Sequence, residues 1–242
     1  MEKFTLLSGL IVLGSFLLSA CGLSVLNGSG KIVSENRPVK DFDQISFSGM
    51  GDMYLQQGDE ESLRIEAEDN LLPYIKSDVV NGSLRIYFDH NNLHFVHPTQ
   101  PVRIYVGLKQ VKSIELSGAV RMLSESLRGD TLHVDISGSG NMDLKQLEVN
   151  ELTTKISGSG KCNIQGETNT QNIVISGSGK FDTRNLYSRD VNIRVSGSGK
   201  AQVNAEEQLD VHISGSGDVA YFGNPRVQKS ISGSGNVYQQ SN

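Results

Sequence analysis

Apolar and polar residues alternate one by one through most of the chain after residue 110. In the segment 131–136, for example, Leu132, Val134 and Ile136 are each preceded by a polar residue. A period of two places the apolar side chains on one face of an extended strand, whereas a helix would need a period near 3.6. The same alternation recurs in Leu152/Thr154/Ile156, Ile173/Ile175, Val191/Ile193/Val195 and Leu209/Val211/Ile213. The pattern predicts a series of half-buried β-strands.

Each of these strands ends at the tetrapeptide Ser-Gly-Ser-Gly, and a shorter apolar alternation follows it. The six copies begin at Ser137, Ser157, Ser176, Ser196, Ser214 and Ser232. Repeats of this length cannot bury an apolar face alone, but they can do so when they stack. Glycine suits a sharp bend that needs positive φ or a close approach to the next coil. We therefore predict an all-β fold, a right-handed parallel β-helix with rungs of about 18–20 residues.

The preceding part of the chain is less regular but also rich in strands. We interpret residues 31–110 as irregular first coils that cap the β-helix and residues 111–242 as the regular repeats, so that 31–242 form one continuous domain. Residues 69–75 are predicted to form a helical turn with Asp69 as its N-cap. Asn81-Gly82, between two apolar segments, predicts a β-hairpin.

The N-terminus has the features of a bacterial export signal. Residues 4–18 are apolar but too few to span a bilayer comfortably, which is typical of a signal peptide. The segment 18–21, Leu-Ser-Ala-Cys, resembles the lipobox of bacterial lipoproteins. We expect residues 1–20 to be removed, Cys21 to carry the acyl chains and residues 21–30 to form a flexible spacer. Two or more acyl chains anchor a protein durably to a membrane, which predicts a location in the cell envelope, at the outer membrane. An ordinary signal peptide with an incidental cysteine is the alternative.

Composition removes several other classes of protein. The net charge of −5 argues against a general nucleic-acid binder. The two cysteines, Cys21 and Cys162, are too few for a disulfide framework. Cys162 lies at an inward strand position and is predicted to be a small buried hydrophobic residue. The Gly-Ser-Gly-Lys segments lack the remaining residues of a phosphate-binding loop, and we expect no cofactor.

The residue after the tetrapeptide is lysine in three consecutive repeats. Stacking would bring Lys161, Lys180 and Lys200 into one column about 5 Å apart. Such a column could bind an acidic glycan or a lipid headgroup, or it could be a solvated edge whose charges discourage aggregation.

Two further groups of side chains are candidates for metal binding and for catalysis. The spacing of His90, His94 and His97 would allow a shared metal ion, although their polar surroundings also fit an exposed loop. An enzyme that cleaves glycans would need clustered outward acids. The outward aspartates fall at different places in their rungs, namely Asp135, Asp182, Asp190 and Asp210.

The chain resembles the auto-transporter adhesin family with a head GIN domain. The matching segments are Phe42-Asp43-Gln44-Ile45, Gly49-Met50-Gly51-Asp52-Met53-Tyr54-Leu55, Ser62-Leu63-Arg64-Ile65-Glu66-Ala67, Asp69-Asn70-Leu71-Leu72 and the Ser-Gly-Ser-Gly series. The resemblance implies a β-helical envelope protein with an adhesive role toward a glycan or a matrix protein. We therefore expect a lipid-anchored binding protein rather than an enzyme. The alternatives are a polysaccharide-processing β-helix enzyme and a passive envelope scaffold.

Overall fold

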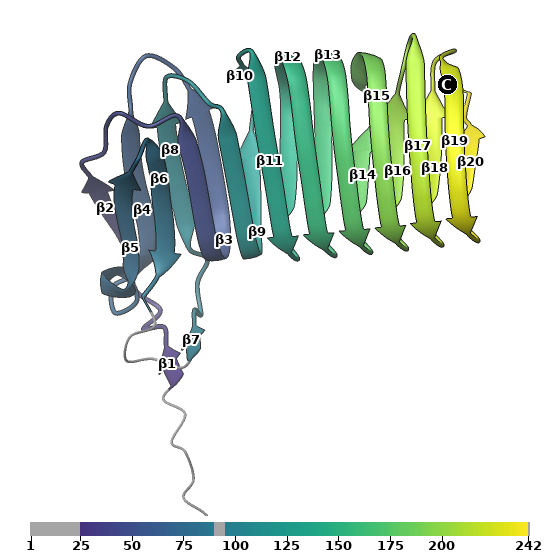
Figure 1. The fold of residues 1–242 in the computed structure, drawn as a ribbon. Coiled ribbons are helices and arrows are strands. Elements are labelled where there is room, and N and C mark those ends of the chain that lie inside the picture. The colour runs from purple at the N-terminus through teal and green to yellow at the C-terminus, as the bar shows by residue number, and fades with distance from the viewer. Residues whose placement is uncertain (1–24, 90–94, 242) are drawn as a thin grey trace, which may run out of the picture.

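The computed structural model describes residues 25–89 and 95–241, and it confirms the predicted β-helix. The chain winds into a rod of about six turns, with a less regular arrangement at its N-terminal end (Figure 1). Strands account for nearly all of the described secondary structure, and no helix in these residues is long and apolar enough to cross a membrane.

In the regular part of the rod, every strand pairs in parallel with the equivalent strand of the next coil. Ser137 pairs with Ser157, which in turn pairs with Ser176, so the sequence repeat is also the structural repeat. The strands are β9 (Ser113–Ser124), β10 (Leu127–Arg128), β11 (Thr131–Gly138), β12 (Asn141–Gly158), β13 (Lys161–Gly177), β14 (Lys180–Thr183), β15 (Leu186–Gly197), β16 (Lys200–Asn204), β17 (Gln208–Gly215), β18 (Asp218–Phe222), β19 (Arg226–Gly233) and β20 (Asn236–Gln239).

The predicted inward positions form columns of buried side chains along the rod. One column stacks in register and consists of Ile136, Ile156, Ile175, Val195 and Ile213. Removing each such side chain from water contributes about 1.5–3 kcal/mol. Some inward positions carry polar side chains, and these form hydrogen bonds with one another. Gln171 accepts a hydrogen bond from the Thr183 hydroxyl (3.1 Å) and donates one to Ser188, so these groups do not lose their hydrogen bonds on burial.

The two glycines of each tetrapeptide are needed for different reasons. The first has positive φ, +113° at Gly177, a region that side chains disfavour. The second lacks positive φ but lies against the core of the preceding rung. A β-carbon on Gly179 would lie 2.6 Å from Cγ2 of Ile156. The tetrapeptide therefore allows the chain to turn sharply while adjacent coils stay in contact.

The N-terminal part joins antiparallel strands to the parallel coil. Its strands are β2 (Ile32–Arg37), β3 (Gln44–Gln57), β4 (Ser62–Glu68), β5 (Ile75–Val80), β6 (Ser83–Phe88) and β8 (Arg103–Leu108). Strand β3 runs parallel to β6, β8 and β9, whereas β2 with β4, β4 with β8, and β5 with β6 are antiparallel. The predicted hairpin is confirmed, because Val80 pairs with Ser83 across Asn81 and Gly82, which both have positive φ.

The helical turn is shorter than predicted, and the prediction of Asp69 as its N-cap was wrong. A 3-10 helix, η1, covers only Leu72–Tyr74, and its capping residue is Leu71, which makes no side-chain cap. Asp69 instead accepts a hydrogen bond from the Ser29 hydroxyl (2.6 Å) and pairs with Lys31 at 3.3 Å. The carboxylate is engaged by the N-terminal segment, and the helix begins three residues later.

A two-stranded projection leaves the capped end of the rod. Strand β1 (Val25–Asn27) pairs in parallel with β7 (Phe95–His97), and Figure 1 shows the pair standing out below β3 and β6. We call these six residues the N-terminal finger. Residues 21–30 were expected to form a flexible spacer. In the described part of this segment, residues 25–27 instead form a paired strand.

Candidate functional site

The three predicted lysines form a column on one outer face of the rod. Lys161, Lys180 and Lys200 are the first residues of β13, β14 and β16, and each pairs in register with the next. Parallel pairing places successive backbones about 4.8 Å apart. All three side chains are exposed, and we refer to them as the lysine column.

Backbone hydrogen bonds hold the lysine column in place. The N–H groups of Lys161, Lys180 and Lys200 donate to the carbonyls of glycines in the preceding rung, each at 2.9 Å. These bonds lie directly after the turns, where the chain enters the next strand. The spacing of the lysine backbones is thus set by a continuous ladder in the scaffold.

The charges along the column are only partly neutralised. Lys200 lies 3.8 Å from Asp218 in the following rung. On the other side, Asn141 pairs with Lys161, and then Arg121 bonds to Asp52 through two contacts of 3.1 Å. No salt bridge within residues 25–89 and 95–241 involves Lys161 or Lys180. Two adjacent ammonium groups therefore face solvent without a carboxylate partner in this part of the chain.

The neighbouring outward column carries acids and amides. Three of its four members have local side-chain partners, whereas Oε1 of Gln202 has no hydrogen-bond partner among the described residues. Asp143, Asn163, Asp182 and Gln202 stack in register. Asn163 donates to Asp143 (3.0 Å), and Arg184 donates to both oxygens of Asp182 (3.0 and 2.8 Å). The guanidinium of Arg184 thus engages Asp182, the carboxylate two residues after Lys180. Asp218, which pairs in register with Lys200, is the acid next to the column.

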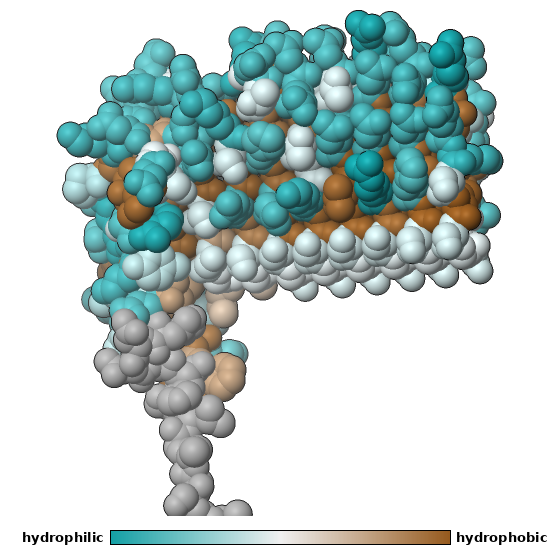
Figure 2. Space-filling model, in the orientation of Figure 1, coloured by the Kyte–Doolittle hydropathy of each residue, from teal (hydrophilic) through white to brown (hydrophobic). Residues whose placement is uncertain are grey.

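An uncharged ridge borders the lysine column. It consists of the serines and first glycines of the six tetrapeptides, which are exposed except for the half-buried Ser137 and Gly215, and we call it the Ser-Gly ridge. It forms the pale band along the lower edge of the rod in Figure 2. A strip of hydrophobic residues lies directly above this band, and the hydrophilic residues of the flank lie above the strip. The ridge offers hydroxyl and peptide groups in a regular array but no charge.

The four outward aspartates do not come together. None of them pairs in register with another. Asp190 lies 3.7 Å from Arg189, Asp210 accepts from Gln208 (2.7 Å), and Asp135 accepts from Ser137 (3.5 Å). Each of these carboxylates therefore has a partner other than a second aspartate.

Of the remaining sequence candidates, the structure describes His97 and Cys162. His97 ends β7, while His90, His94 and Cys21 lie outside the described residues. Among the residues that are described, no three of His, Cys, Asp and Glu are grouped so that they could hold a metal ion. Cys162 is buried as predicted, with its Sγ 3.9 Å from Sδ of Met142, and burial raises the pKa of its thiol.

Sequence reasoning missed a groove near the capped end. The rings of Tyr54 and Tyr105 stack with centroids 5.0 Å apart, and Arg64 lies 3.8 Å over the Tyr105 ring. They line a cavity of about 760 Å³ with Asn36, Gln56 and Glu125. Tyr54 and Tyr105 are 51 residues apart and meet only because β3 pairs with β8. Arg64 and Tyr54 lie on the two strands that flank β8, and both pack against the Tyr105 ring.

Comparison with known proteins places the chain among bacterial adhesin-like proteins. It is 25% identical to a solved putative adhesin from Bacteroides fragilis, with a TM-score of 0.82 over 89% of this chain and all of that one. A putative lipid binding protein from Parabacteroides distasonis is 24% identical, with a TM-score of 0.76 over 90% of this chain and all of that one. A putative adhesin from Parabacteroides merdae is also 24% identical, with a TM-score of 0.72 over 89% of this chain and 99% of that one.

No curated protein matches the sequence. The family model described as "Putative auto-transporter adhesin, head GIN domain" matches residues 41–225, which include most of the cap and most of the repeats. The chain therefore belongs to this family, as the resemblance in its sequence predicted.

Proposed function

We propose that this protein is a lipid-anchored adhesin of the bacterial cell envelope and that the lysine column contacts an acidic glycan. The observation that carries the proposal is the register of Lys161, Lys180 and Lys200. Three positive side chains at a repeat of about 4.8 Å face solvent on a rigid strand surface. A linear polyanion that runs along the rod would meet several of these charges at once.

The anchor rests on the sequence of the leader. Leu-Ser-Ala-Cys at residues 18–21 follows an apolar segment of signal-peptide length. Acyl chains on Cys21 would hold the protein at the outer membrane, where an adhesin meets its ligand. Membership of an adhesin-like family supports this location.

Binding fits the described residues better than catalysis does. The outward aspartates bond to neighbours of their own rungs and do not pair with one another. A passive scaffold would need neither free ammonium groups nor a regular charged column. Binding of an anionic ligand would explain why the lysine column is exposed and carries unpaired charges.

The test compares adhesion of cells that carry three forms of the full chain. Cells with the wild type should adhere to a surface coated with an acidic polysaccharide, and cells with Lys161→Gln/Lys180→Gln/Lys200→Gln should lose most of this adhesion. The matched control is Lys40→Gln/Lys155→Gln/Lys229→Gln, which removes the same charge from three exposed lysines elsewhere. It should adhere like the wild type.

Each alternative predicts a different outcome of this experiment. Equal adhesion by all three forms would reject the lysine column, and no adhesion by any form would favour the scaffold. Shortened polysaccharide chains in the medium would favour an enzyme. Loss of adhesion to vesicles with anionic lipid, but not to polysaccharide, would make a lipid headgroup the ligand.

A further inference from the structure

We infer that the N-terminal finger contacts the membrane surface and that the rod consequently lies along the membrane instead of standing away from it. This inference rests on the proposed lipid anchor at Cys21. It adds a second contact with the lipid surface, made by Val25 and Phe95, and a defined orientation of the adhesive face.

Covalent geometry brings the finger close to the anchor. Val25 comes four positions after Cys21 in the chain. A fully extended chain advances at most about 3.6 Å per residue, so Val25 lies within roughly 14 Å of the acylated residue. An acylated cysteine sits at the boundary between headgroups and acyl chains. The finger must then lie at or next to the headgroups.

The side chains at the end of the finger suit this environment. Val25 pairs with Phe95 across the two strands, and their exposed fractions are 52% and 58%. Two large apolar side chains side by side on a projection lose contact with water when they enter the interfacial region of a bilayer. The described residues of the finger include no Lys, Arg, Asp or Glu, so charge does not oppose this contact.

A buried carboxylate attaches the finger firmly to the rod. Glu68, 1% exposed, accepts hydrogen bonds from the Gly30 N–H (2.6 Å), the Thr99 N–H (2.9 Å) and the Thr99 hydroxyl. These partners follow the two strands of the finger in the chain. The Glu68 carboxylate lies directly against Gly28, so any larger residue at this position would force the carboxylate to move.

Further hydrogen bonds fix the same junction. The Gly28 N–H donates to the carbonyl of His97 (3.0 Å), and Asn70 donates to the carbonyl of Asn27 (2.8 Å). With both strands held, the direction of the finger is set by the fold.

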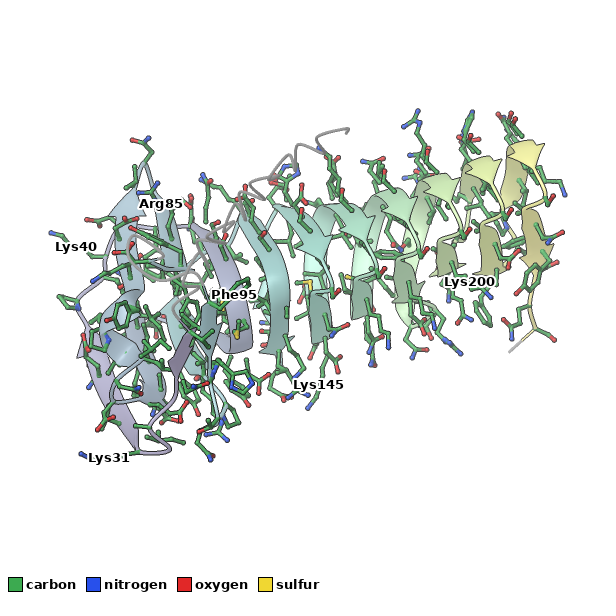
Figure 3. All side chains as sticks on the ribbon, turned by 90° about the horizontal axis from the view of Figure 1, so that it is seen from below. Lys31, Lys40, Arg85, Phe95, Lys145 and Lys200 are labelled. Carbon is green, nitrogen blue, oxygen red and sulfur yellow. The ribbon has the colours of Figure 1, made fainter. Side chains whose placement is uncertain are left out.

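That direction decides how the rod faces the membrane. The finger leaves across the long axis of the rod, on the side where β11, β13, β15 and β17 end (Figure 1). This is the side of the Ser-Gly ridge, as Figure 2 shows. Figure 3 is seen from this side and shows Phe95 at the capped end, with Lys200 projecting from a flank farther along the rod. A membrane at the tip of the finger would therefore face the uncharged ridge and leave the lysine column open at the flank.

The absence of tryptophan from the chain makes a direct test possible. Phe95→Trp and Tyr187→Trp each introduce a single fluorophore at an exposed aromatic position, the first on the finger and the second, 57% exposed, at the start of β15. The full-length acylated proteins are reconstituted into phosphatidylcholine vesicles with and without brominated acyl chains. Bromine should quench most of the emission of Phe95→Trp and leave that of Tyr187→Trp unchanged. Val25→Trp provides a second reporter on the finger and should behave like Phe95→Trp.

Mass spectrometry of the same samples separates this inference from the anchor. Acylated protein with no quenching at positions 25 and 95, or with equal quenching at position 187, would overturn the orientation and leave the anchor intact. Protein that carries no acyl chain would overturn the anchor and this inference together.

Discussion

Gly177 lies against Gly158 of the preceding rung so closely that a β-carbon on Gly177 would be 2.7 Å from the Gly158 carbonyl oxygen. The two residues pair in register, and the φ of Gly177 is +113°. The glycine at this turn therefore satisfies two conditions at once, a conformation that side chains disfavour and a backbone contact that leaves no room for one.

Gly177→Ala should destabilise the protein by about 1–3 kcal/mol, because the new methyl group meets backbone atoms that cannot move aside cheaply. Ser178→Ala, the adjacent control, removes only a solvent-exposed hydroxyl group and should cost less than about 0.5 kcal/mol. Urea unfolding followed by circular dichroism gives both values. Equal midpoints would show that the turn tolerates a side chain.

Cys21→Ser should abolish attachment of lipid, because the acyl chains of a lipoprotein have no other acceptor in the leader. Cells fed a fatty-acid analogue with a clickable group would label the wild type and not the variant. Cys162→Ser is the matched control and should be labelled like the wild type. Continued labelling of Cys21→Ser would remove the basis for the anchor.

The junction between the finger and the rod should loosen in acid. Burial raises the pKa of Glu68, but the hydrogen bonds from Thr99, Gly30 and Gln100 together outweigh it, so the pKa lies below the ordinary value. A carboxyl group with a lowered folded-state pKa contributes stability above the unfolded-state value, near 4.5, and loses it as pH falls through the folded-state value.

Hydrogen exchange of residues 28–30, corrected for the intrinsic effect of pH, should therefore accelerate below about pH 4 in the wild type. Glu68→Gln, which cannot ionise, should exchange faster at pH 7 and show much less of this dependence. A wild type whose protection at this junction stays constant down to pH 3 would contradict the role of the carboxylate.

Cys162 should be unreactive in the folded protein. Its thiol is buried beside Met142, and burial raises its pKa, so little thiolate forms at neutral pH. In the Cys21→Ser background it is the sole thiol of the chain. A maleimide reagent should leave it unmodified for hours under native conditions and modify it rapidly in urea. Rapid native labelling would show that the inner column opens to solvent.

The regular part of the rod was predictable because its determinants are local. The alternation around Leu132, Val134 and Ile136, followed by a tetrapeptide at near-constant spacing, specifies strand, turn and stacking together. The same spacing was sufficient to place Lys161 beside Lys180. Both results follow from one repeat that has the same structure in each coil.

The N-terminal part was less predictable because its contacts join distant segments. Glu68 bonds to Gly30 and Thr99, which are 38 and 31 residues away, and no local pattern indicates such a group. The same holds for Tyr54 and Tyr105, whose stacking depends on the pairing of β3 with β8. The prediction that Asp69 caps a helix was wrong because its carboxylate accepts a hydrogen bond from Ser29, which is 40 residues away in the chain.

The most direct test of the account is the salt dependence of binding by the lysine column. Retention of the wild-type soluble domain on an immobilised acidic polysaccharide should fall steeply between 0.05 and about 1 M NaCl, where the screening length shrinks to ~3 Å. The Lys161→Gln/Lys180→Gln/Lys200→Gln variant should bind weakly at low salt, depend little on salt, and melt at nearly the same temperature as the wild type, since exposed charges contribute little to stability. Identical retention of the two proteins at every salt concentration would contradict the assignment of the lysine column as the binding site.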